Sequence, residues 1–164
     1  MKTVFIIRHA KSNWSFGDLS DFERPLNDRG NGDAPMMAER ILKKKLEIDL
    51  LLTSTAKRAR QTCEHFSDTL GKNRKDIVLD DSLYHASSDM IHYVIRMLDN
   101  RFQSVAIFTH NPGVTDFVNG LIDGMNIDNM PTCGVFCVES NIIDWKQFEK
   151  SEKKFKFFDY PKLS

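Results

Sequence analysis

The chain has 164 residues, of which 41% are hydrophobic and 28% are charged, and its 23 basic residues equal its 23 acidic ones in number. This composition is typical of a globular protein in water, and the length suits a single domain over residues 1–164. Without a basic excess the chain offers no electrostatic footprint for nucleic acid. With no long apolar stretch and no signal peptide, we expect no membrane span and a cytoplasmic location, and the oligomeric state stays open.

Apolar runs alternate with helical segments along the chain. In chain order we expect a strand at 3–7, a polar loop to residue 25, a helix near 31–45, a strand at 48–53, a helix at 56–70, a strand at 76–79, a helix at 88–101, a strand at 104–109, a helix at 113–123, and closing strands near 134–139 and 142–148. The tail could add an edge strand over 155–158. Strands that alternate with helices need crossover connections, which give a mostly parallel sheet. The predicted fold class is α/β, with helices on both faces of a central sheet in three α/β/α layers.

Three cysteines are present, Cys63, Cys133 and Cys137, and we expect them to be reduced and mostly buried. Cys133 and Cys137 flank a predicted strand, where four residues span roughly 13 Å, farther than the ~7 Å that a disulfide allows between α-carbons. A lone Cys-x-x-x-Cys also offers too few ligands for zinc. The sequence therefore predicts neither a disulfide nor a metal site.

Polar side chains directly follow three of the apolar runs. Arg8 and His9 come after the first run, His110 follows the run at 105–108, and Arg58 lies soon after the run at 48–52. Active sites of open α/β sheets lie beyond the carboxyl ends of the strands, so these side chains should meet at one edge. Arginine forks bind two phosphate oxygens at once. Two imidazoles and two guanidinium groups at one edge predict a site for a phosphoryl group that needs no metal or other cofactor.

Each of these residues has a chemical reason to be there. A histidine that attacks phosphorus must present a neutral ring nitrogen, and the cationic neighbours of His9 disfavour its protonation. Arg58 falls in the first turn of a helix, where a cation costs roughly 0.3–1 kcal/mol, which suggests that a bound anion offsets the cost. His110 can donate to a phosphate oxygen during transfer. The alternatives are surface or capping roles for Arg8 and His9 and a structural role for His110.

Four further residues are candidates for substrate binding. Arg24 precedes Pro25 in the first loop, where a solvated loop role is the alternative, and Ser12 and Asn13 could donate to a phosphate. His85 follows the fourth predicted strand and precedes a helix, which is again a carboxyl-end position. Active sites favour such positions, so His85 belongs with the candidates.

Three motifs resemble those of the histidine phosphatase superfamily (phosphoglycerate mutase-like), in the same order and over residues 3 to about 121. They are Arg8-His9-Ala10-Lys11-Ser12-Asn13-Trp14, Ser54-x-Ala56-x-Arg58-Ala59-x-x-Thr62 and His110-Asn111-Pro112-Gly113. The resemblance implies a phosphoglycerate mutase-like fold, a phosphohistidine intermediate at His9 and a substrate-phosphate contact for Arg24. The small size and the Arg24-Pro25-Leu26 form are most similar to the SixA-type phosphohistidine phosphatase branch.

The sequence departs from the family pattern at the general acid. Many members carry a glutamate or aspartate after the fourth strand that protonates the leaving group, and no carboxylate clearly has that position here. His85 can stand in for it, and Asp18 or Asp21 are weaker candidates, so the acid is unassigned. The segment 71–84 is also too short for a covering lid. Both features favour a phosphohistidine-bearing protein as substrate. One alternative is a phosphomonoesterase or phosphoglycerate mutase-like enzyme that acts on a small phosphorylated metabolite. The other is a non-catalytic phosphate-binding module.

Overall fold

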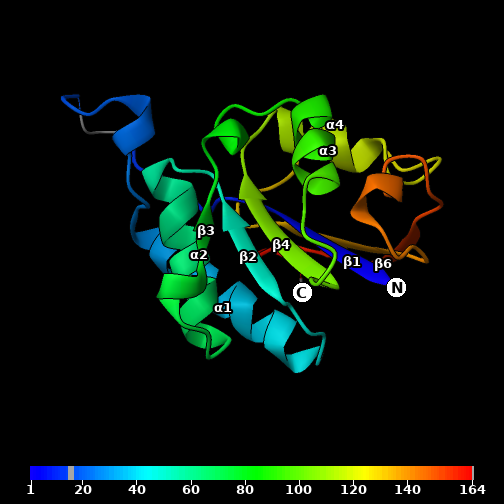
Figure 1. Cartoon of the computed structure of the whole chain (residues 1–164). Coiled ribbons are helices and arrows are strands. Elements are labelled where there is room, and N and C mark those ends of the chain that lie inside the picture. Colours follow the sequence, from blue (N-terminus) through cyan, green and yellow to red (C-terminus); the bar gives the residue numbers. More distant parts are fainter. Residues whose placement is uncertain (15–16, 164) are drawn as a thin grey trace.

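The computed structural model describes residues 1–14 and 17–163. In this part of the chain six strands form one sheet in the order β3-β2-β4-β1-β5-β6 (Figure 1). They are β1 (Lys2–Arg8), β2 (Leu50–Thr53), β3 (Val78–Leu79), β4 (Ser104–Thr109), β5 (Val135–Ser140) and β6 (Lys154–Asp159). The first four strands pair in parallel, whereas β5 is antiparallel to both β1 and β6. The predicted mostly parallel α/β sheet is confirmed.

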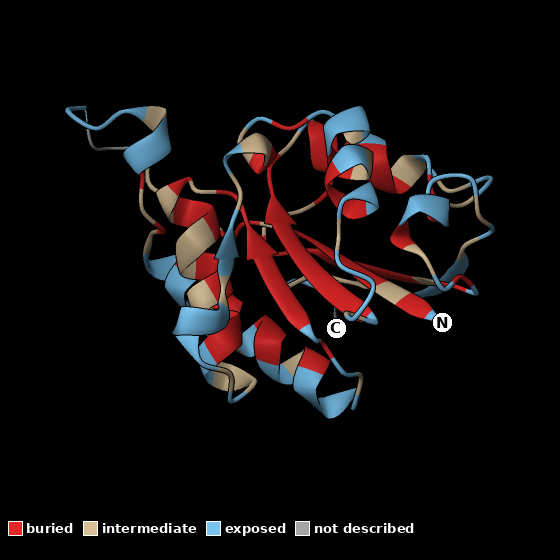
Figure 2. Cartoon of the chain, in the orientation of Figure 1, coloured by how far each residue is buried: buried red, intermediate tan, exposed pale blue. Residues whose placement is uncertain are grey.

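Helices cover both faces of the sheet. Successive residues of a strand point to opposite sides, so the apolar central strands have two apolar faces to bury. Phe5 of β1 belongs to one buried cluster with Phe66, and Val4 belongs to the other with Phe117. The first cluster takes in α1 (Asp28–Lys43) and α2 (Lys57–Thr69), and the second takes in α3 (Ser88–Arg96) and α4 (Gly113–Asn119). Figure 2 shows the central strands buried between these layers.

The register of the parallel strands brings three chain segments to one edge. Arg8 of β1 is opposite Thr109 of β4, and Thr53 of β2 is opposite Phe108. The strands therefore end within one residue of one another. Whatever follows β1, β2 and β4 is delivered to the same place, as the sequence predicts.

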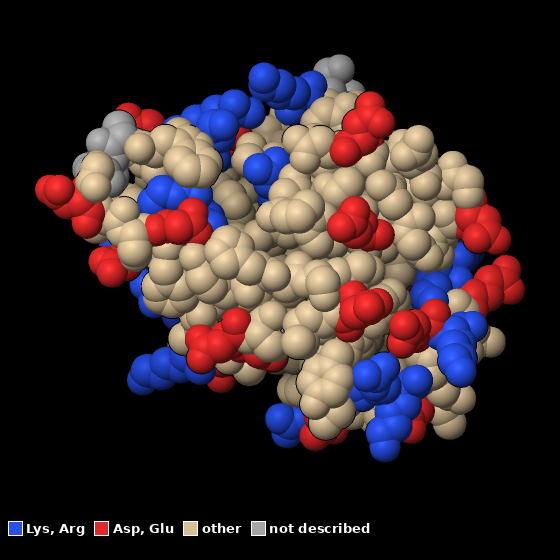
Figure 3. Space-filling view, turned by 90° about the horizontal axis from the view of Figure 1, so that it is seen from above, with Lys and Arg blue, Asp and Glu red and all other residues tan. Residues whose placement is uncertain are grey.

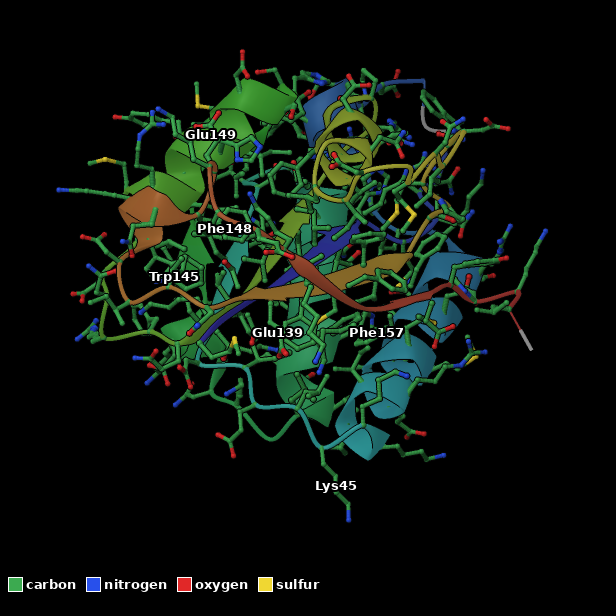
Figure 4. The ribbon with its side chains drawn as sticks, turned by 90° about the vertical axis from the view of Figure 1, so that its right-hand side faces the viewer. Lys45, Glu139, Trp145, Phe148, Glu149 and Phe157 are labelled. Atoms are coloured by element: carbon green, nitrogen blue, oxygen red, sulfur yellow. The ribbon has the colours of Figure 1, made fainter. Side chains whose placement is uncertain are left out.

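The prediction of a second closing strand near 142–148 is wrong. This segment contains a 3₁₀ turn over Trp145–Gln147, capped by the Asp144 side chain, which accepts from the Lys146 amide at 2.9 Å. A capping side chain offers the backbone an alternative to a sheet ladder. The last strand is β6, which takes in the predicted edge strand at 155–158. Figure 4 shows Trp145 and Phe148 on the α3 side of the sheet and Phe157 on the α1 side.

Helix ends also differ from the predicted ones. α1 begins at Asp28 rather than near residue 31, because the Asn27 side chain accepts from the Gly30 amide at 2.9 Å and caps the helix. α3 ends at Arg96 and α4 at Asn119, both short of the predictions at 101 and 123. No helix in the described ranges is long and apolar enough to cross a membrane.

Two glycines allow close approaches that shape the edge of the sheet. A Cβ on Gly30 would overlap with the carbonyl oxygen of Lys11, so α1 can pack against the loop after β1 only with glycine there. A Cβ on Gly113 would overlap with the carbonyl oxygen of Ala86, the residue after His85. Both contacts draw loops toward the carboxyl ends of the strands.

Candidate active site

A cavity of about 240 Å³ lies where β1, β2 and β4 end. Figure 3 looks onto this side of the molecule and shows Lys and Arg gathered on one part of it, with Asp and Glu close by. Seven of the eight predicted site residues line the cavity: Arg8, His9, Ser12, Arg24, Arg58, His85 and His110. The strand ends therefore bring together residues that are far apart in the sequence.

His9 is buried at the base of the cavity with its ring in a defined orientation. Its Nδ1 lies 2.7 Å from the carbonyl oxygen of Ala10, which can only accept, so Nδ1 carries the proton. Nε2 is then unprotonated and accepts from Nε of Arg58 at 3.3 Å. Burial, reinforced by His110 and the nearby arginines, holds the pKa of His9 well below its usual value. The ring is neutral at physiological pH and has a nucleophilic lone pair.

Arg58 lies in the first turn of α2, and each of its nitrogens has a partner. Besides the contact with His9, Nη1 donates to the main-chain oxygen of Asp21 at 2.6 Å and Nη2 donates to the Asp21 carboxylate at 3.0 Å. The sequence suggests an anion that offsets a cation at this helix N-terminus, and here the Asp21 carboxylate supplies one.

His110 faces His9, with 5.1 Å between the ring centroids. Its Nε2 lies 2.8 Å from the hydroxyl of Ser54, which also accepts from the Ala56 amide at 3.2 Å. Nδ1 is buried without a hydrogen-bond partner among the described residues. Burial, and then Arg58, lower the pKa of His110 to about 3, so this ring is also neutral.

Arg8 completes the base of the cavity. Its Nη1 donates to the Met130 carbonyl at 2.8 Å, and burial followed by Arg58 lowers its pKa. The Cys133 amide donates to the carbonyls of Arg8 and His9, both at 3.0 Å, and so fixes the chain behind the nucleophile. The three cysteines are free and buried, as predicted: Cys63, Cys133 and Cys137. Burial raises the pKa of each thiol, to about 12 for Cys137.

Arg24 and Ser12 lie together at the entrance of the cavity. A bridge between Ser12 and Leu26 brings the two parts of the loop side by side, and Arg24 Nη1 donates to the Ser12 hydroxyl at 2.7 Å. The guanidinium also stacks on Trp14, 3.6 Å from the ring centroid. Asn13 is not among the described residues that line the cavity; its main-chain oxygen accepts from Arg24 Nη1 at 3.4 Å.

The carboxylate of Asp21 lies between Arg24, Arg58 and the segment after β3. It accepts from the Tyr84 hydroxyl at 2.7 Å, and Nε2 of His85 lies 3.6 Å away. The Tyr84, Arg24 and Arg58 contacts outweigh burial and lower the pKa of Asp21 far below its usual value. Asp21 is therefore held ionised.

His85 also lines the cavity, next to Asp21. It has a left-handed φ of 55°, and its side chain is 61% exposed. A non-glycine residue in that conformation is uncommon. Asp18, the other loop carboxylate considered for the acid, is exposed and is not among the described residues lining the cavity.

Sequence reasoning did not assign three residues that organise the site. Ser54 and Thr62 belong to the second motif, yet their partners are visible only in the fold. Ser54 contacts His110, and the Thr62 hydroxyl accepts from the Ala10 amide at 3.0 Å and donates to the Arg58 carbonyl at 2.7 Å. Tyr84 had no signal in the sequence. No group of three or more His, Cys, Asp or Glu in the described ranges could hold a metal ion.

Comparison with known sequences gives the family directly. The model of the histidine phosphatase superfamily (branch 1) matches residues 4–89, more than half of the chain. The 2,3-bisphosphoglycerate-dependent phosphoglycerate mutases of Mesorhizobium japonicum and Brucella ovis are 27% and 30% identical over 84 residues. Each match covers 50% of this chain and 41% of the relative, so this chain matches less than half of the length of these relatives.

Solved structures match over nearly the whole chain. The putative phosphohistidine phosphatase SixA from Agrobacterium tumefaciens has a TM-score of 0.82 and 27% identity, covering 98% of both chains. A protein histidine phosphatase SixA complexed with tungstate has a TM-score of 0.80 and 25% identity, covering 97% of both chains. The phosphoglycerate mutase-like fold and the predicted family are confirmed. The chain belongs to branch 1 of the histidine phosphatase superfamily, and its structure resembles those of SixA phosphohistidine phosphatases.

Proposed function

We propose that the protein is a phosphatase that takes a phosphoryl group onto Nε2 of His9 and then passes it to water. The observation that carries the proposal is the orientation of His9, whose Nδ1 donates to the Ala10 carbonyl, so that Nε2 carries the lone pair. That lone pair accepts from Nε of Arg58 at 3.3 Å, a contact that the incoming phosphoryl group would replace. The Nε2–P bond forms as the bond from phosphorus to the leaving group breaks, and the electron pair departs with that group. Attack by water on phosphorus then returns the pair to Nε2 and releases inorganic phosphate.

The other residues at the base of the cavity would stabilise the charge on the transferring group. Arg8 and Arg58 supply the positive charge without a metal ion. A Ser54 hydroxyl that donates to Nε2 of His110 leaves the proton on Nδ1, which can then donate to a phosphoryl oxygen. Arg24 would make a weaker contact from the entrance.

The proposed substrate is phosphohistidine displayed on a protein. Asp21 is the carboxylate among the described cavity-lining residues, and it is ionised, so it has no proton to give to a leaving group. An alkoxide leaves poorly without a proton donor. An imidazole whose other nitrogen is protonated leaves as a neutral molecule and needs little further help. The likeness to SixA phosphohistidine phosphatases supports the same substrate class.

The intermediate can be tested by trapping. A reaction with labelled phosphohistidine peptide, quenched in alkali, should leave label on the protein that survives alkali and is lost in acid, as a phosphoramidate is. His9→Ala should carry no label and keep less than a few per cent of activity. A His9→Ala variant that keeps more than a few per cent of activity would contradict the proposal.

His85 favours a second candidate function, the hydrolysis of a small phosphomonoester or a mutase-like reaction. Its imidazole lines the cavity and could protonate an oxygen leaving group. The test compares kcat/KM on a phosphohistidine peptide with that on an aryl phosphate and on 3-phosphoglycerate, with and without 2,3-bisphosphoglycerate. His65→Ala, on α2 outside the cavity lining, is the control for His85→Ala. A tenfold preference for a monoester that vanishes in His85→Ala would make His85 the acid and overturn the protein substrate.

A further inference from the structure

The carboxylate of Asp21 is bound by Arg24 and Arg58, two of the three arginines that the proposed function assigns to the phosphoryl group. Its Oδ1 accepts from Arg24 Nε at 3.2 Å and Nη2 at 2.9 Å. Its Oδ2 accepts from Arg58 Nη2 at 3.0 Å and from the Tyr84 hydroxyl at 2.7 Å. The two oxygens together therefore receive hydrogen bonds from three side chains.

A bound phosphoryl group would require the same donors. An arginine fork binds two oxygens of a carboxylate or of a phosphate in the same way. The three nitrogens of Arg58 are all engaged: Nε with His9, Nη1 with the main chain of Asp21 and Nη2 with its carboxylate. These bonds use three of its five N–H groups. A phosphoryl group that reaches His9 and binds Nε and Nη2 of Arg58 side by side competes with the Asp21 carboxylate for Nη2.

Asp21 can release these donors without unfolding its loop. Its main-chain oxygen accepts from Arg58 Nη1 at 2.6 Å and from the Arg24 amide at 3.2 Å, which anchors the backbone. The Asp21 side chain is 40% exposed, whereas the side chains of Arg58 and Arg24 are 4% and 9% exposed. The carboxylate can therefore rotate toward solvent while the buried arginines stay in place.

We infer that Asp21 is an internal competitor for the phosphoryl-binding arginines. Its carboxylate holds Arg24 and Arg58 when no phosphoryl group is bound, yields to the substrate, and returns to expel inorganic phosphate. The inference rests on the proposed function, because it takes this cavity as the phosphoryl site. Product phosphate among several cationic groups would otherwise leave slowly, so Asp21 sets a low affinity for the free product.

The direct test is the binding of inorganic phosphate, measured by isothermal titration calorimetry. Asp21→Asn keeps the size of the side chain and removes its charge, and Asp21→Ala removes the whole competitor. Asp18→Asn is the matched control, because it removes the same charge from an exposed position in the same loop. We expect both Asp21 variants to bind phosphate about 10-fold tighter than wild type, equivalent to about 1.4 kcal/mol, and Asp18→Asn to bind within about twofold.

The opposite result has a clear physical meaning. If the carboxylate serves only to position Arg24 and Arg58, both Asp21 variants will bind phosphate more weakly than wild type. Weaker binding, unchanged binding, or equal tightening in Asp18→Asn would each overturn the inference. Thermal melts before titration identify a variant that has not folded, and either Asp21 variant alone is sufficient for the test.

Turnover supplies a second measurement. The inhibition constant of inorganic phosphate, as product, should fall in Asp21→Asn by the same factor as its dissociation constant. Calorimetry measures phosphate binding without turnover, so the role of Asp21 can be tested independently of the proposed phosphatase activity. A wild type that binds phosphate but hydrolyses no substrate would remove the proposed function, and the titration would still decide the role of Asp21.

Discussion

The base and the entrance of the cavity are built in different ways. The base consists of Arg8, His9, Arg58 and His110, which end a strand, directly follow one or lie in the first turn of α2. The entrance consists of Arg24, Asp21 and His85, which come from loops and short turns and are held by contacts between side chains. The base is fixed by backbone register, whereas the entrance depends on which side chains find one another. Chemistry that needs fixed geometry should depend more on the base than on the entrance.

The largest predicted effect contrasts Arg58 with Arg24. Arg58→Ala should lower kcat/KM by roughly 100- to 1000-fold, because loss of one preorganised donor costs about 2.7–4 kcal/mol. Arg58→Lys should recover little, since lysine has no fork. Arg24→Ala should lower kcat/KM by about 10-fold, which corresponds to the loss of one peripheral hydrogen bond.

The control for the arginine series is Arg60→Ala, two residues along α2 and therefore on another side of the helix. It should keep the wild-type rate. Equal losses in Arg24→Ala and Arg58→Ala would mean that the entrance contributes as much to the transition state as the base, and the contrast between the two regions would be lost.

The same contrast explains which parts of the site could be predicted from the sequence. Arg8, His9 and His110 follow apolar runs, and parallel strands end at one edge, so their convergence was predictable from the chain. The Asp21 contacts were not, because nothing in the sequence aligns its loop with Arg58 or Tyr84, 37 and 63 residues away. The strand prediction around Trp145 was wrong for a similar reason. Its apolar run resembles a strand, but the Asp144 side chain caps a 3₁₀ turn there.

The buried histidines of the base predict a pH dependence of stability. The pKa of His110 is about 3 in the folded chain and ~6.5 when unfolded, so between these values the unfolded state binds a proton that the folded state does not. The free energy of unfolding should therefore fall as the pH drops below ~6.5, by about 2 kcal/mol at pH ~5 from His110. Burial lowers the pKa of His9 too, so His9 acts in the same direction.

Urea unfolding at several pH values between about 7 and 5 measures this loss, above the range in which most carboxylates titrate. His110→Gln should reduce the loss by about 2 kcal/mol, because the variant has no proton to bind. His65→Gln, outside the cavity lining, should keep the wild-type slope. A stability that does not change over this range in wild type would show that the base is solvated and open.

The smallest predicted effect concerns Ser54, which acts on the reaction through His110. Ser54→Ala removes the partner of Nε2 at 2.8 Å, so the ring loses both its fixed tautomer and its orientation toward the phosphoryl group. We expect kcat to fall about fivefold with little change in KM, since one such hydrogen bond is worth about 1 kcal/mol. Thr53→Val is the matched control, because it removes a neighbouring buried hydroxyl that donates to the Ser54 carbonyl at 3.0 Å and does not contact His110. Both variants should lower the melting temperature, but only Ser54→Ala should lower kcat. Equal kcat values in the two variants would mean that strand register alone orients His110, and that the base needs no side-chain partner.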